Sequence, residues 1–132
     1  MRKVYLCGAI EGLDREQAYA WRDVAKKVLQ EHYIVLDPLD NDELMSRKEI
    51  FLADIKNVEE ADIILTEMTH PDKAYIGTSM ELWHAYQLGK IILVWGEANK
   101  DNLFLEQVTR TRFDSLEDAL SSLKALNKLH NS

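Results

Sequence analysis

The sequence is short of cysteine and of long apolar runs, and each shortage excludes a class of protein. Cys7 is the only cysteine among the 132 residues, so no disulfide can form within the chain. The longest apolar runs, such as IILVW at 91–95, are far shorter than the ~20 residues that cross a bilayer. The chain starts directly on a strand-like run without a signal-peptide pattern. We therefore expect a cytoplasmic protein that neither spans nor binds a membrane.

Basic charge is also scarce. Lysine and arginine number 16 against 23 acidic residues, which gives a net charge of -7 and a pI near 5.1. Binding of a nucleic-acid polymer requires a concentrated basic face, so we do not expect one as a partner, although a single nucleoside remains possible. The four histidines and one cysteine show no metal-ligand spacing, and G-x-G-x-x-G and Walker A motifs are absent. We expect neither a metal nor a cofactor.

What the sequence does contain is an alternation of short apolar runs with segments of helical period. Strands are predicted at 3–8, 33–36, 62–66 and 91–95, with an edge strand at 108–113; helices are predicted at about 14–32, 47–60 and 78–89 and after Ser115. Asp14 and Gln17 form a predicted capping pair. The pattern indicates one domain over residues 1–132, an α/β flavodoxin-like doubly wound parallel sheet of order 2-1-3-4-5 with helices on both faces.

In such a sheet, ligands bind beyond the carboxyl ends of the strands. The segment IGTSMELWHAYQLGK at 76–90 begins after one of these ends and carries the acidic Glu81. If its helix starts near Thr78 or Ser79, Glu81 lies in the first turn, where the helix dipole keeps a carboxylate ionised, as a nucleophile requires. Alternatively, Glu81 completes a capping box with Thr78.

Five motifs in order resemble one known family. VYLCGAIEG at 4–12, DPLDN at 37–41, ADIKNVEEADIIL at 53–65, GTSMEL at 77–82 and DNLF at 101–104 are similar to motifs of the nucleoside 2-deoxyribosyltransferases and the related nucleotide N-glycosidases. The resemblance covers about residues 3–120. It implies that Glu81 is the nucleophile that captures C1' of a nucleoside, that Asp54 protonates the leaving base, and that Tyr5 orients Glu81.

The same resemblance implies further contacts. Substrate-binding positions are expected at Gly8, Ala9, Asp40, Gly77, Ser79 and Asn102. The position of Asn102 reaches a neighbouring subunit's pocket in the family, so a homo-oligomer with shared active sites is implied. Asp62 precedes strand 3 and is interpreted as structural. Trp21, Trp83 and Trp95 are interpreted as core residues, because they lie on periodic apolar faces.

Two departures from the family pattern affect the expected substrate. Tyr75 stands six residues before Glu81, where the transferases usually have an aspartate that binds the base, so base recognition must differ. Ala9 and Glu11 stand where the nucleotide-hydrolysing relatives have a serine and an arginine that hold a 5'-phosphate. Because a carboxylate repels phosphate, an unphosphorylated nucleoside is favoured, although TEMTHP at 66–71 looks closer to the hydrolases.

Several functions stay open. The leading hypothesis is transfer of deoxyribose from a 2'-deoxynucleoside to another nucleobase through a covalent glycosyl-Glu81 intermediate. The alternative is hydrolysis of the N-glycosidic bond of a nucleoside or its 5'-monophosphate, with the same nucleophile. A non-catalytic nucleotide-binding module and an acidic protein-interaction domain are further hypotheses.

Overall fold

The computed structural model describes residues 1–41 and 43–130 and contains a five-stranded parallel sheet of order β2-β1-β3-β4-β5. The predicted fold class and strand order are confirmed. The strands are β1 (Lys3–Cys7), β2 (Ile34–Leu36), β3 (Ile63–Glu67), β4 (Ile91–Trp95) and β5 (Thr111–Phe113). The central strands β1, β3 and β4 are mostly buried, as their apolar runs predict, whereas the edge strands β2 and β5 are partly exposed.

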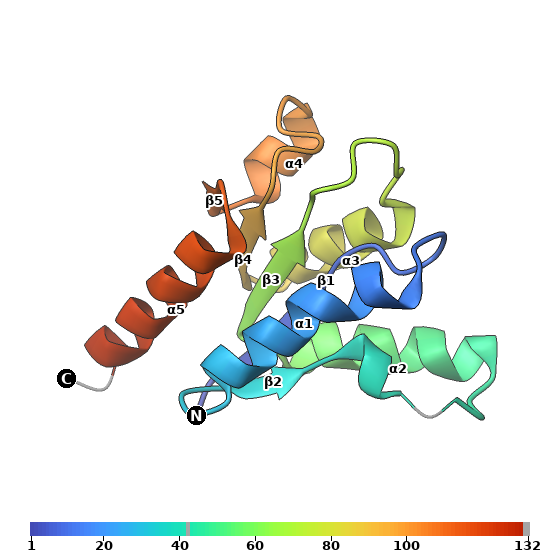
Figure 1. Ribbon diagram of the computed structural model, residues 1–132, viewed down its shortest axis with the longest axis horizontal. Coiled ribbons are helices and arrows are strands. Elements are labelled where there is room, and N and C mark those ends of the chain that lie inside the picture. Colours follow the sequence, from blue (N-terminus) through green and yellow to red (C-terminus); the bar gives the residue numbers. More distant parts are fainter. Residues whose placement is uncertain (42, 131–132) are drawn as a thin grey trace.

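Helices cover both faces of this sheet (Figure 1). They are α1 (Arg15–Leu29), α2 (Arg47–Glu60), α3 (Ile76–Gln87), α4 (Leu103–Val108) and α5 (Leu116–His130), with a short 3₁₀ turn, η1 (Pro38–Asp40). The strands alternate between two cores. Val4 and Leu6 of β1 pack with α1 and α5, whereas Tyr5 and Cys7 pack with α2, α3 and α4. This alternation points Tyr5 toward the helix that carries Glu81.

Helix α3 begins earlier than the sequence predicts. Its first residue is Ile76, and Tyr75 precedes it in the left-handed region with φ of 52° and no side-chain cap. The predicted capping box between Thr78 and Glu81 is therefore wrong, and Glu81 lies in the second turn. The Asp14–Gln17 capping box of α1, in contrast, is confirmed.

Other local predictions also differ. The edge strand is shorter than predicted, because part of the segment belongs to α4, a six-residue helix that the sequence reading missed. Trp21 and Trp95 do pack in the α1/α5 core and their rings meet edge to face. Trp83, however, is 51% exposed, so its assignment to the core is wrong. None of the described helices combines the length and apolar character needed to cross a membrane.

Candidate active site

Two side chains of β1 contact the carboxylate of Glu81. The Tyr5 hydroxyl donates a hydrogen bond to Glu81 Oε2 at 2.6 Å, and the Cys7 thiol lies 3.8 Å from Glu81 Oε1. Tyr5 and Cys7 are two residues apart on β1, so they share the face that α3 covers. Burial raises the pKa of the Cys7 thiol well above its usual range, so the thiol faces Glu81 in its neutral form.

Glu81 is less acidic than an ordinary glutamate. Burial raises the pKa of its carboxyl group from 4.5 to about 7, and the nearby charge of Asp54 adds to the rise. Hydrogen bonds from Tyr5 and Cys7 act in the opposite direction, because they stabilise the carboxylate. The sequence expectation was a carboxylate kept ionised in the first turn of the helix; Glu81 lies in the second turn, and burial shifts its pKa in the opposite direction.

Asp54 approaches from α2. Its Oδ1 accepts a hydrogen bond from the Asn41 side chain at 3.2 Å, which orients the carboxyl group from the end of η1. Burial raises the pKa of Asp54, and the Asn41 hydrogen bond partly offsets this. Two carboxyl groups of raised pKa therefore share one site, an arrangement typical of acid and nucleophile pairs.

These groups line a cavity of about 370 Å³ between the loop after β1, helix α2 and the start of α3. We call it the Glu81 cavity. Its lining residues are Gly8, Ala9, Ile10, Glu11, Asp54, Lys73, Ala74, Tyr75, Ile76, Gly77, Thr78 and Glu81. The cavity has the position at the carboxyl ends of β1 and β3 that this topology favours for ligands, and its volume is within the usual range for small-molecule sites.

Three predicted substrate-binding residues lie elsewhere. Ser79 and Asn102 line a separate, largely apolar groove of about 580 Å³, together with Met80, Trp83, Phe104 and others. Asn102 also caps α4, accepting the Leu105 N–H at 3.1 Å. Asp40 pairs with Lys26 at 2.8 Å and does not line the Glu81 cavity. The structure thus brings together Gly8, Ala9, Gly77, Asp54 and Glu81, with Tyr5 reaching the cavity through Glu81.

Glu67 is a residue of the site that the sequence reading missed. It ends β3, is 1% exposed, and its Oε2 accepts hydrogen bonds from the Thr69 N–H at 2.6 Å and the Tyr75 hydroxyl at 2.6 Å. Its Oε1 accepts the Ala9 N–H at 3.3 Å. One buried carboxylate therefore ties the loop after β1 to the loop before α3, which are two walls of the cavity. The signal for Glu67 in the sequence was an acidic residue at the end of an otherwise largely apolar strand.

Gly8 is required by the same carboxylate. A Cβ at this position would lie 3.0 Å from both Cβ and Oε1 of Glu67. The close approach that the structure shows at Gly8 is to Glu67, and Gly8 also lines the Glu81 cavity. At Gly77, in contrast, an added Cβ would meet nothing within 4 Å, so this glycine leaves open space in the cavity wall.

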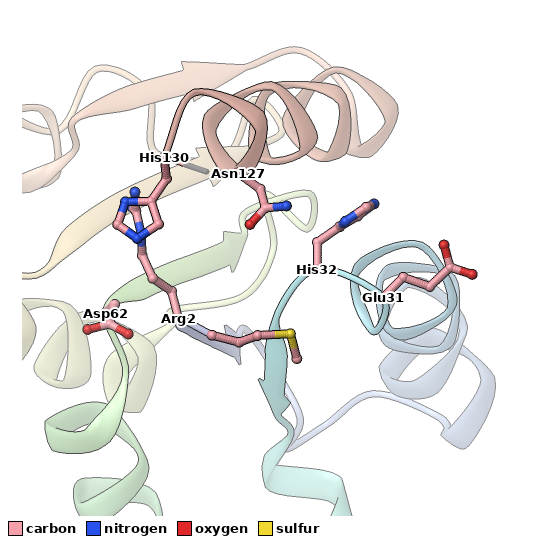
Figure 2. A pocket seen from close by; sticks show the side chains of 7 residues that line it. Arg2, Glu31, His32, Asp62, Asn127 and His130 are labelled. Carbon is pink, nitrogen blue, oxygen red and sulfur yellow. The ribbon is translucent and has the colours of Figure 1, made fainter. Parts of the chain in front are cut away.

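A polar cleft of about 460 Å³ lies at the other end of the sheet (Figure 2). Arg2, Glu31, His32, Asp62, Asn127 and His130 line it. The Asp62 carboxylate accepts the Lys3 N–H at 2.8 Å, which places it at the amino ends of β1 and β3, away from Glu81. The structural interpretation of Asp62 agrees with this position. Among the described residues, no cluster of His, Cys, Asp or Glu side chains could hold a metal ion.

Comparison with known proteins is consistent with this geometry. The sequence profile of the family described as nucleoside 2-deoxyribosyltransferase matches residues 4–115. A 5-hydroxymethyl-dUMP N-hydrolase from Rattus norvegicus is 35% identical over 97 residues, which cover 68% of this chain and 58% of the relative. The chain thus matches little more than half of that relative's length.

Two solved structures share the fold. A 2-deoxyribosyltransferase from Bacillus psychrosaccharolyticus is 24% identical, with a TM-score of 0.69 over 89% of this chain and 90% of the other. A CMP N-glycosidase from Clostridium botulinum is 20% identical, with a TM-score of 0.67 over 94% and 99% of the two chains. At these identities, the likeness to both is one of fold.

Proposed function

The chain belongs to the nucleoside 2-deoxyribosyltransferase family, and on this premise we propose that it cleaves the N-glycosidic bond of a 2'-deoxynucleoside or its 5'-phosphate. The observation that carries the proposal is the Glu81 carboxyl group in a strand-end cavity, hydrogen-bonded by Tyr5 and lined also by Asp54. A second, independently oriented carboxyl group beside the first is what a double-displacement mechanism at an anomeric carbon requires.

In the proposed reaction, Glu81 attacks C1' while the bond from C1' to the base nitrogen breaks. The transition state resembles an oxocarbenium ion, which the ionised carboxylate stabilises before it forms the glycosyl ester. Tyr5 holds Oε2, and the only contact described for Oε1 is the 3.8 Å approach of the Cys7 thiol. We therefore assign the attack to Oε1, and Tyr5 fixes its direction.

Asp54 is the proposed general acid. The electron pair of the broken bond goes to the base, which leaves more easily when it gains a proton. The raised pKa of Asp54 increases the fraction of carboxylic acid that can donate this proton. In the second step, the resulting carboxylate can remove a proton from the incoming acceptor, which attacks C1' and releases Glu81.

Water is the acceptor that we favour, and the reaction is then hydrolysis. Tyr75 occupies the position at which the transferases usually have a base-binding aspartate, and its hydroxyl is already bonded to Glu67 at 2.6 Å. The 35% identity to an N-hydrolase supports the same choice. Transfer to a second nucleobase is the alternative, supported by the family profile that matches residues 4–115.

The test is to incubate the protein with 2'-deoxyinosine or its 5'-monophosphate, with and without free adenine. Release of hypoxanthine independent of adenine supports hydrolysis, and formation of the deoxyadenosine product supports transfer. A Glu81→Gln variant is the control for both, and trapping of one sugar mass on the peptide that contains Glu81 would identify the ester. If wild type and Glu81→Gln turn over equally, Glu81 is not the nucleophile.

We also propose that the protein forms a homo-oligomer through the apolar groove. Met80, Trp83 and Phe104 expose 66%, 51% and 74% of their surface there, beside Ser79 and Asn102. Exposed aromatic side chains clustered in this way are typical of protein interfaces. A partner seated on this groove would lie next to α3 and so close to the Glu81 cavity, as the expected role of Asn102 requires.

A further inference from the structure

The charges around the Glu81 cavity are unevenly distributed. Three carboxyl groups line it, those of Glu11, Asp54 and Glu81, whereas Lys73 is the one basic side chain among the lining residues that the structure describes. Lys73 belongs to the loop between β3 and α3, and it reaches back across the cavity mouth to the loop after β1. Whether Lys73 is free to bind an anionic group therefore depends on the contacts of its ammonium group.

Lys73 has no carboxylate partner among the described residues. Its Nζ donates one hydrogen bond to the Gly12 carbonyl oxygen at 3.0 Å, and this contact is exposed. No carboxylate of residues 1–41 or 43–130 lies within 4 Å of the ammonium group, in contrast to Lys26, which contacts both Asp37 and Asp40. An ammonium group has three N–H donors, so two remain for a ligand. An unpaired cation at a cavity wall attracts an anionic group.

Glu11 opposes an anion less than its sequence position suggests. Its side chain is 90% exposed, and Oε1 lies 3.6 Å from the Arg47 guanidinium at the start of α2. Water screens an exposed carboxylate strongly, and the neighbouring guanidinium offsets its charge. The sequence argument against a phosphate, which rested on Glu11, therefore loses its force in the structure.

Lys73 and the reacting groups face different parts of the cavity. Glu81 is held at the floor by Tyr5 of β1, whereas Lys73 is held at the end of the first loop by Gly12. Ile76 and Gly77, at the start of α3, line the same cavity. A nucleotide that places C1' at Glu81 and its 5' end toward the first loop would bring its phosphate to Lys73.

This geometry rests on the proposed function and extends it: we propose that Lys73 binds the 5'-phosphate of the substrate, so that 2'-deoxynucleoside 5'-monophosphates are preferred to nucleosides. The loop after β1 has Glu11 where the nucleotide-hydrolysing relatives have an arginine. Lys73, from the loop before α3, then supplies the positive charge instead. The Gly12 contact holds the lysine side chain over the cavity before the phosphate arrives.

The experiment compares kcat/KM for the four common 2'-deoxynucleosides and their 5'-monophosphates in wild type, Lys73→Met and Lys73→Arg. We expect the wild type to prefer the monophosphate of its best base about 10- to 100-fold, the range of one charge-assisted hydrogen bond. Lys73→Met should lose most of this preference, whereas Lys73→Arg should keep it. Lys90→Met is the matched control, because Lys90 also donates to a backbone carbonyl, that of Glu59 at 2.7 Å, but lies outside the cavity.

Calorimetric titration with the same monophosphates separates this inference from the proposed function. Lys73-dependent binding without turnover supports the phosphate contact and contradicts the proposed reaction. Cleavage with an equal phosphate preference in wild type and Lys73→Met, or with no preference in either, overturns the role of Lys73 and leaves the reaction standing. Absence of both binding and cleavage overturns both.

Discussion

The Tyr5 hydroxyl lies 2.6 Å from Glu81 Oε2 and joins residues 76 positions apart in the chain. Tyr5→Phe removes this bond and keeps the ring. Because the bond lowers the pKa of Glu81, its loss should raise that pKa further and leave less nucleophile ionised at neutral pH. We expect kcat at pH 7 to fall about 10- to 100-fold, the effect of one hydrogen bond to a charged group. Measuring kcat as a function of pH for the wild type and Tyr5→Phe tests this prediction.

A matched control for Tyr5 exists on the opposite face of the sheet. The Tyr33 hydroxyl donates to the Leu123 carbonyl at 2.6 Å and is equally buried. Tyr33→Phe should lower stability without moving the pH profile of the reaction. If both variants change kcat by the same factor, Tyr5 acts only through stability.

The pH dependence of the wild-type enzyme follows from the Glu81 pKa of about 7. A nucleophilic carboxylate must be ionised and the general acid Asp54 must keep its proton, so kcat/KM should rise with pH as Glu81 ionises through about 7 and fall again where Asp54 ionises. Asp54→Asn removes the falling limb together with a charge that raises the Glu81 pKa, so the rising limb should move to lower pH and lead to a lower, flat rate. Asp40→Asn is the control outside the cavity; a limb that stays in place in Asp54→Asn would contradict this coupling.

Glu81 should also cost stability at alkaline pH. Its pKa is higher in the folded state than its ordinary value of 4.5, so folding stability is lost as pH rises from about 4.5 through about 7. Glu81→Gln cannot ionise, so at pH 8 its free energy of unfolding should exceed that of the wild type by about 3 kcal/mol. Near pH 4 the gain should vanish. Denaturant titrations at both pH values test this, with the exposed Glu106→Gln as a control.

Glu67→Gln should be strongly destabilising despite its conservative size. Every described hydrogen-bonding neighbour of this carboxylate donates to it, from Ala9, Thr69 and Tyr75. A glutamine would place an amide NH₂ group, itself a donor, opposite some of these donors. We expect the free energy of unfolding to fall by about 2 kcal/mol or more. Tyr75→Phe removes one donor to Glu67 and also the acceptor of the His70 N–H, so it should be destabilising as well. Urea denaturation measures both losses against the exposed Glu106→Gln; a Glu67→Gln variant as stable as the wild type would contradict the prediction.

The proposed homo-oligomer has a direct test. Trp83→Lys places a charge in the centre of the exposed aromatic groove, where Trp83 stacks on Tyr86 at a centroid distance of 5.8 Å. We expect light scattering to report a smaller assembly for this variant at the same concentration. Lys124→Glu on α5 is the control, since it changes charge on the other face of the sheet. A monomeric wild type would refute the proposal.

The sheet order was predictable because the central strands β1, β3 and β4 are mostly buried and nearly all apolar, and because strands and helices alternate along the chain. The alternation of Val4 and Leu6 with Tyr5 and Cys7 then assigns residues to faces without further information. The position of Glu81 at the carboxyl end of the sheet followed from the same topology and from the motif around it. These are consequences of periodicity and connection order, which a sequence displays directly.

The details of the site were not predictable in the same way. The start of α3 depends on Tyr75 adopting a left-handed conformation, which is uncommon for a bulky residue and leaves no sequence pattern. Glu67 gains its role from the Ala9 amide 58 positions away. The pKa of Glu81 depends mainly on burial between β1 and α3. Trp83 was misread because the helical period identifies an apolar face but not whether this chain covers it.

The polar cleft at the amino ends of the strands has a practical consequence. Met1 and His130 both line it, so the first and last described residues lie at the end of the sheet opposite Glu81. An affinity tag, a fluorescent fusion or a surface linker attached at either end would therefore extend away from the crevice. Immobilised protein should accept substrate as freely as protein in solution.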